Sequence, residues 1–129
     1  MASSGPHSGE ATNDFDLLVV SLLVAMTDAE GQVAVHRTTL QALVEAMQAE
    51  PEWREGAGTI PAHTGGLRRA IADALINLRQ HGLVIMNNKG FAVTPSGRKA
   101  VSSTDKLSAE HERLLRFVGK KSQEWRSTA

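Results

Sequence analysis

The sequence has no cysteine and no tyrosine, and its aromatic residues are three phenylalanines and two tryptophans. The lack of cysteine excludes a disulfide scaffold, a thiolate zinc site and a cysteine nucleophile. So few aromatic residues are typical of a helical domain rather than an all-β sandwich. The longest apolar stretch, Leu17–Met26, is interrupted by Ser21 and is about half the length that spans a bilayer. Residues 1–12 lack the basic start and apolar centre of a signal peptide. We therefore expect a cytoplasmic protein without a membrane partner.

The chain also lacks a net charge, but its charges are unevenly distributed. It has 129 residues, which suits one domain, and 41% of them are hydrophobic. Residues 1–61 contain two basic and nine acidic residues, whereas residues 62–100 contain six basic residues and only one acidic residue, Asp73. The neutral total therefore hides a basic module, which is either a surface for an anionic partner or a solvated face balanced by acidic neighbours.

The first expected helix runs from Asn13 or Asp14 to about Asp28, and Gly31 follows its end. Its apolar residues cover nearly the whole circumference, which predicts burial on all sides. In a domain of this size, we expect a partner subunit to supply part of that cover. The alternative is a β-strand for part of Leu17–Val24, although length and the N-terminal cap favour a helix.

The next residues predict a short strand over Gln32–Val35 and a second helix over Leu40–Gln48, capped by Thr38 or Thr39. The segment Glu50–Thr64 contains two prolines and two glycines, so we expect a long loop.

A third helix is expected over Gly66–His81, ending at Gly82. Its predicted buried stripe consists of Leu67, Ala70, Ile71, Ala74, Leu75 and Leu78. Two alternating runs, Leu83–Asn87 and Phe91–Thr94, flank Asn88-Lys89-Gly90 and predict a β-hairpin, in which Asn and Gly adopt the unusual backbone angles of the turn.

A short helix over Ser96–Ser102 and a last helix from Ser108 to about Gln123 complete the expected elements. The predicted fold class is mainly α with a small β-hairpin (α+β). We divide the chain into a disordered tail (1–12), a winged-helix domain (13–104) and a C-terminal helix for dimerisation or interaction (105–129).

The third helix and the hairpin carry a resemblance. Residues 74–84, Ala-Leu-Ile-Asn-Leu-Arg-Gln-His-Gly-Leu-Val, and residues 90–98, Gly-Phe-Ala-Val-Thr-Pro-Ser-Gly-Arg, resemble bacterial winged helix-turn-helix regulators of the multiple-antibiotic-resistance (MarR) and PadR types. The long loop is similar to that in the N-terminal domain of Mrr-type restriction proteins. The resemblance covers about a quarter of the chain, and the hairpin is shorter than is usual in MarR-type regulators.

The resemblance implies a double-stranded DNA-binding protein whose third helix enters the major groove while the hairpin touches the flanking backbone. The implied DNA-contacting residues are Arg37, Thr39, His63, Thr64, Arg68, Arg69, Asn77, Gln80, Lys89, Arg98 and Lys99. Asn77 and Gln80 are the expected readers of adenine, Arg68 and Arg69 are expected to meet bases or phosphates, and the others are expected to contact phosphates.

We expect a homodimer acting as a transcriptional regulator or as a plasmid or phage DNA-binding factor. Two alternatives stay open, a winged-helix module for protein–protein interaction and an accessory subunit of a restriction or repair system. The five histidines are scattered and no catalytic framework is present, so we expect no enzyme activity, no metal and no cofactor.

Overall fold

The computed structural model describes residues 14–50, 66–103 and 105–128, without the side chains of residues 14, 105–110 and 128. The predicted tail and most of the predicted loop, including His63 and Thr64, therefore lie outside the described residues. Within the described ranges, no helix is long and apolar enough to cross a membrane.

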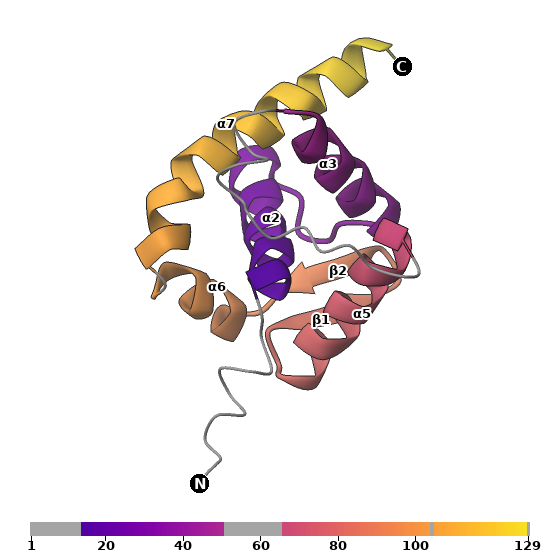
Figure 1. Cartoon of the computed structure of the whole chain (residues 1–129). Helices are drawn as coiled ribbons and strands as arrows, with labels where there is room; N and C mark the ends of the chain where they lie inside the picture. The colour runs from indigo at the N-terminus through magenta and orange to yellow at the C-terminus, as the bar shows by residue number, and fades with distance from the viewer. Residues whose placement is uncertain (1–13, 51–65, 104, 129) are drawn as a thin grey trace, which may run out of the picture.

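The described residues form five helices and one two-stranded antiparallel sheet, which confirms the predicted mainly helical α+β class. In chain order the elements are α2 (Asp14–Glu30), α3 (Arg37–Ala49), α5 (Gly66–Gln80), β1 (Val84–Asn87), β2 (Gly90–Val93), α6 (Pro95–Ser102) and α7 (Asp105–Thr128). Figure 1 shows α2 in the middle of the molecule, with the other helices and the sheet arranged around it.

Helix α2 is the centre of the core. Its apolar side chains from Phe15 to Met26 are buried except for Leu17, which is partly buried. The buried hydroxyl of Ser21 is satisfied within the helix, because it donates to the Leu17 carbonyl at 2.7 Å. The cover comes from α3, α5, α6, α7 and β2 of the same chain. The all-round apolar surface of α2 therefore needs no partner subunit, contrary to the reasoning from sequence.

The hairpin is joined to the segment before α3. Strands β1 and β2 pair with Val84 opposite Val93 and Asn87 opposite Gly90. Val35 adds a single antiparallel bridge to Phe91, with backbone hydrogen bonds of 2.8 Å in both directions. The predicted strand over Gln32–Val35 is thus reduced to one residue. A Cβ on Gly90 would lie 2.5 Å from the Val35 carbonyl oxygen, so this close approach requires glycine.

The turn of the hairpin differs from the prediction at Asn88. Among the described residues only glycines have positive φ, and Gly90 (φ 133°) is the one in this turn. The side chain of Asn87 stabilises the turn instead, because its Oδ1 accepts a 2.7 Å hydrogen bond from the Lys89 backbone N–H.

Two helices begin earlier than predicted. Helix α3 begins at Arg37, after His36, which makes no side-chain cap, so the predicted threonine caps are wrong. Its start follows the Val35 bridge, a tertiary contact that periodicity does not encode. Helix α7 begins at Asp105 rather than after Ser108.

Helix α7 also extends past Gln123, and two ion pairs join its C-terminal part to the residue that follows α3 and to the last residue of α2. Lys121 Nζ lies 3.7 Å from Glu50 Oε1, and Arg126 donates to Glu30 at 2.7 Å.

Candidate nucleic-acid interface

Helix α5 divides cleanly into a buried and an exposed side. Ile71, Leu75 and Leu78 are buried, whereas Arg68 and Arg69 are exposed. The buried stripe includes five of the six predicted residues, and the sixth, Leu67, is half-buried against the core. The prediction that the two adjacent arginines look outward is therefore confirmed.

The exposed side of α5 carries further polar groups at regular spacing. Residues eleven positions apart are separated by about three helical turns, or about 16 Å along the axis, and so lie on the same side of the helix. Arg79 is therefore aligned with Arg68, and Gln80 with Arg69. Arg69 Nε donates to Asp73 at 3.1 Å. Within the described part of the chain, Arg68 and Arg79 make no ion pair. This row of positive charge is open to solvent.

The structure places Asn77 away from this exposed side. Its amide nitrogen donates to the Asp16 carboxylate at 2.7 Å, and Asp16 is 4% exposed. The hydrogen bond joins α5 to α2, so Asn77 serves packing in this structure. An adenine-reading role for Asn77 would require breaking that bond.

Lys89 lies in the turn of the hairpin and is exposed. Between this hairpin and the start of α3 is a hollow of about 300 Å³, lined by Arg37 and Thr38 on one side and by Met86, Asn88 and Phe91 on the other. Thr39 is half-buried and does not line the hollow. The structure therefore brings Arg37 beside the hairpin turn.

Arg98 and Lys99 of α6 have different surroundings. Arg98 donates to the Asp28 carboxylate at 2.8 Å, and this contact, together with His111, holds the pKa of Asp28 below its usual value. Lys99 is exposed and makes no ion pair within the described residues. Arg98 is thus committed to a structural ion pair, whereas Lys99 is not.

Residues 93–98, which are part of the sequence that resembles winged-helix regulators, have local structural roles. The hydroxyl of Thr94 donates to the Gly82 carbonyl at 2.7 Å and accepts from the Gly97 N–H at 3.1 Å, which caps α6 and ties it to the end of α5. Gly97 packs directly against the Leu83 carbonyl, where a Cβ would clash. The segment fixes the hairpin relative to α5 and α6.

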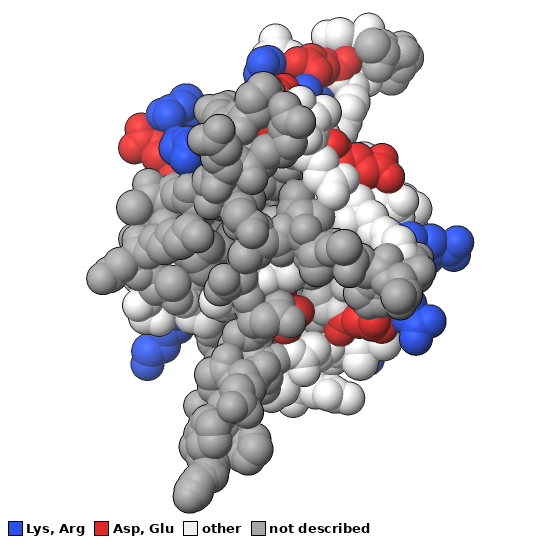
Figure 2. All heavy atoms as spheres, viewed as in Figure 1, with Lys and Arg blue, Asp and Glu red and all other residues white. Residues whose placement is uncertain are grey.

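The reasoning from sequence did not single out Arg79, Ile76, Ile85 or Met86. Arg79 could have been found from its eleven-residue spacing to Arg68. The three apolar side chains are more than half exposed, which periodicity alone did not reveal. Figure 2 shows that on the face in view the described Lys and Arg atoms are separated by acidic and uncharged atoms rather than joined into one patch.

The described residues contain no group of three histidine or carboxylate side chains placed to hold a metal ion. Searches of protein-family models, of curated proteins and of solved structures give no match to this chain.

Proposed function

We propose that the chain is a winged-helix protein that binds double-stranded DNA with the exposed side of α5. The observation that carries the proposal is the placement of three arginines, Arg68, Arg69 and Arg79, on the solvent side of a helix whose other side is buried. The hairpin follows α5 directly, since the Leu83 N–H donates to the Leu78 carbonyl at 3.0 Å. A cationic helix beside a hairpin with a lysine at its turn suits a major groove, about 12 Å wide, and the adjoining phosphates.

The positions on α5 suggest a division of labour. Arg69 and Gln80 lie near the middle of the exposed side, where a helix in the groove meets base edges. Arg68 and Arg79 lie toward one border of that side and would contact phosphates, as would Lys89. Arg37 supplies a further phosphate contact from the start of α3.

One α5 helix spans few base pairs, so we propose binding as a homodimer with two helices in successive grooves. Because α2 is already covered within the chain, the dimer contact must use another surface. Regulation of transcription and service as a plasmid or phage DNA-binding factor, in the cytoplasm, are the roles that suit such a protein.

The experiment is fluorescence anisotropy with a pool of random duplexes at increasing salt. With about four cations on phosphates, log affinity is expected to fall against log salt with a slope of about −4. Replacing Arg68 and Arg69 together by alanine should weaken binding at least about tenfold, since each phosphate or base contact contributes on the order of 1 kcal/mol.

The matched control is the double change Arg113→Ala and Arg116→Ala, which removes the same charge from α7. If both double variants lose the same DNA affinity, the loss reflects the change in net charge and not the position of Arg68 and Arg69. A flat salt response in the wild-type protein would contradict the proposal.

A second function has an observation of its own. Strand β1 lies at the edge of the sheet and exposes Ile85 and Met86, and Ile76 is exposed on α5. Apolar side chains at a free strand edge favour a protein partner, either for an interaction module or for a subunit of a restriction or repair system. Absence of DNA binding at low salt would favour this second function.

A further inference from the structure

An isoleucine lies at the centre of the exposed side of α5. Ile76 is 53% exposed, although isoleucine is among the residues most often buried in folded proteins. Each residue of an α-helix turns the chain by about 100°, which places Ile76 opposite the middle of the buried stripe. That stripe consists of Ala70, Ile71, Ala74, Leu75 and Leu78. The exposure of Ile76 therefore follows from its position in the helix.

Polar side chains flank Ile76 on the same side of the helix. Arg69 lies seven residues before it and Gln80 lies four residues after it, spacings that align side chains along a helix. Arg79 follows Ile76 by three residues, and all three polar side chains are exposed. Ala72, four residues before Ile76, is half-buried. We call Ala72 and Ile76 the apolar centre of α5, because donors lie on both sides of them.

The charges around the apolar centre favour an anionic partner. Three exposed arginines, Arg68, Arg69 and Arg79, share this side of α5 with one exposed carboxylate, Asp73. Arg69 Nε donates to Asp73 at 3.1 Å. Three positive charges against one negative charge leave a positive surplus around Ile76. The partner that covers Ile76 must therefore present apolar surface within a negatively charged surrounding.

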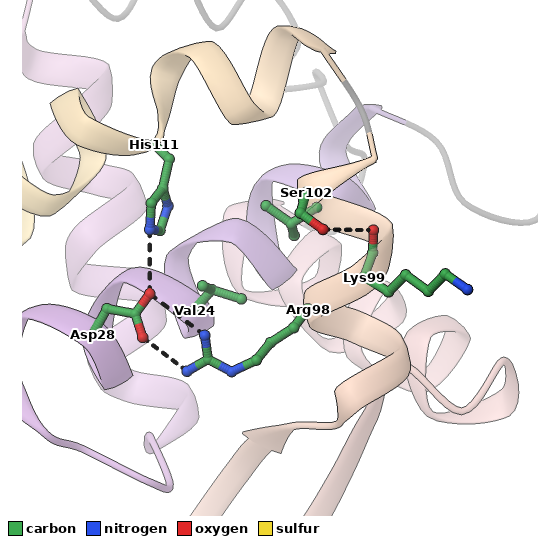
Figure 3. Close-up of a pocket in the computed structure, with 7 residues that line it drawn as sticks. Val24, Asp28, Arg98, Lys99, Ser102 and His111 are labelled. Atoms are coloured by element: carbon green, nitrogen blue, oxygen red, sulfur yellow. Dashed lines mark hydrogen bonds and ion pairs between the residues drawn. The ribbon is translucent and has the colours of Figure 1, made fainter.

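The basic helix α6 has a different arrangement. Figure 3 shows Arg98 and His111 directed toward Asp28, and Lys99 directed away from them. Val101 of α6 is buried, and no large apolar side chain of this helix, every residue of which the structure describes, is exposed. Helix α6 thus presents a cation without an exposed apolar contact, whereas α5 presents both.

The major groove of DNA can match both features of α5. Each base pair offers hydrogen-bond donors and acceptors in that groove, and only thymine offers a methyl group, at C5. An isoleucine placed over a donor or an acceptor would displace water from the polar group without replacing its hydrogen bond, which disfavours binding. Contact with the thymine methyl group has no such cost and buries apolar surface on both partners.

We propose that Ile76, with Ala72 beside it, packs against the C5 methyl group of a thymine and so selects an A·T pair at the centre of each half-site. This inference rests on the proposed DNA-binding function, and it adds the base that the apolar centre of α5 recognises. Arg69 and Gln80 then meet base edges on either side of that pair. Because the contact is apolar, the preference for thymine does not depend on the release of counterions.

The experiment uses the duplex that the wild-type protein binds most tightly in a random pool. Each thymine is replaced in turn by uracil, which lacks the C5 methyl group and keeps the hydrogen-bonding groups. At one position in each half-site, the replacement should weaken binding about threefold to fourfold, the effect of losing the burial of one methyl group. Fluorescence anisotropy measures the affinities. The ratio of thymine to uracil affinity should stay constant as salt is raised, while both affinities fall.

Two isoleucines of nearly equal exposure give a matched pair of variants. Ile76 is 53% exposed on α5, and Ile85 is 54% exposed on β1. Ile76→Ala should weaken binding to the thymine duplex and bring the ratio of thymine to uracil affinity close to one. Ile85→Ala should keep the wild-type ratio, because β1 lies outside the exposed side of α5. Urea unfolding shows that each variant is folded.

Three results would overturn the inference. Equal affinity for the thymine and uracil duplexes at every position, in a wild-type protein that binds DNA, would remove thymine recognition and leave the proposed function intact. A full thymine preference in folded Ile76→Ala would assign that preference to another side chain. Absence of binding to any duplex at low salt would remove the proposed function, and thymine recognition with it.

Discussion

Helices α2 and α5 are of similar length but have opposite relations to solvent. Ten consecutive residues of α2, from Leu17 to Met26, include only one partly buried side chain, and the other nine are buried. In α5 the residues alternate between a buried stripe and a charged exposed side. The first helix organises the core, and the second combines core packing with a free surface.

The comparison shows which kind of apolar pattern leaves room for function. A helix that is apolar on all sides must be enclosed, and here the chain's own α7, α6, α5 and α3 enclose α2. A helix with one stripe needs cover on one side only, so its other side can meet a partner. The following changes test that difference, beginning with the largest expected effect.

Truncation of the core helix should be far more costly than truncation of the exposed one. Leu22→Ala removes a side chain with no solvent exposure and should lower the free energy of unfolding by about 2–5 kcal/mol. Ile76→Ala on the exposed side of α5 should change it by less than about 0.5 kcal/mol. Urea unfolding of both variants measures the difference. Similar losses would mean that the exposed side of α5 is covered in solution.

The hydrogen bond between the two helices gives an intermediate effect. Asn77→Ala removes the donor to the buried Asp16 carboxylate and should destabilise the fold by about 1–3 kcal/mol. Its affinity for DNA, measured on folded protein, should be nearly unchanged. Gln80→Ala, on the exposed side, should show the reverse pattern, with normal stability and weaker DNA binding. A loss of affinity in the Asn77 variant with normal stability would restore the base-reading role.

Asn77 also marks a limit of sequence reasoning. Its place in α5 and the burial of its neighbours follow from the apolar period of three and four. Its partner does not, because Asp16 lies 61 residues away in sequence and local pattern carries no information on that pairing. A polar residue at the border of a stripe is compatible with either side of the helix.

The same limit applies to the ends of elements and to the cover of α2. The Val35 bridge to Phe91, which precedes α3, is a tertiary contact, so the predicted start of that helix at Leu40 was late. The ion pairs near the C-terminal end of α7 are tertiary contacts too, so the predicted end near Gln123 was early. The element order and the outward arginines of α5 depend on local periodicity and were predicted correctly. The dimer contact and the DNA-binding role remain proposals.

The smallest expected effect concerns Asp28, in the last turn of α2, where this helix leaves the core. Arg98 and His111 lower the pKa of Asp28 in the folded protein, so its ionised form stabilises the fold. That contribution is present above the unfolded pKa, about 3.9, and is lost as pH falls through the lower folded value. The pair is partly exposed, with side-chain exposures of 42% for Arg98 and 33% for Asp28, so the expected contribution is below about 1 kcal/mol.

Urea unfolding of wild type and Asp28→Asn at about pH 7 and about pH 3 measures this contribution, since the difference between the two proteins should shrink in acid. Glu112→Gln is the control on α7, because it removes the acceptor of Arg116 from an exposed i,i+4 pair worth a few tenths of a kcal/mol. The Asp28 variant should lose more stability than the Glu112 variant at neutral pH, because Asp28 joins three helices and the Glu112–Arg116 pair lies within one. If the losses are equal, the ion-pair network of Asp28, Arg98 and His111 contributes no more to stability than an exposed pair. The contribution of α2 to stability would then come from its buried apolar side chains alone.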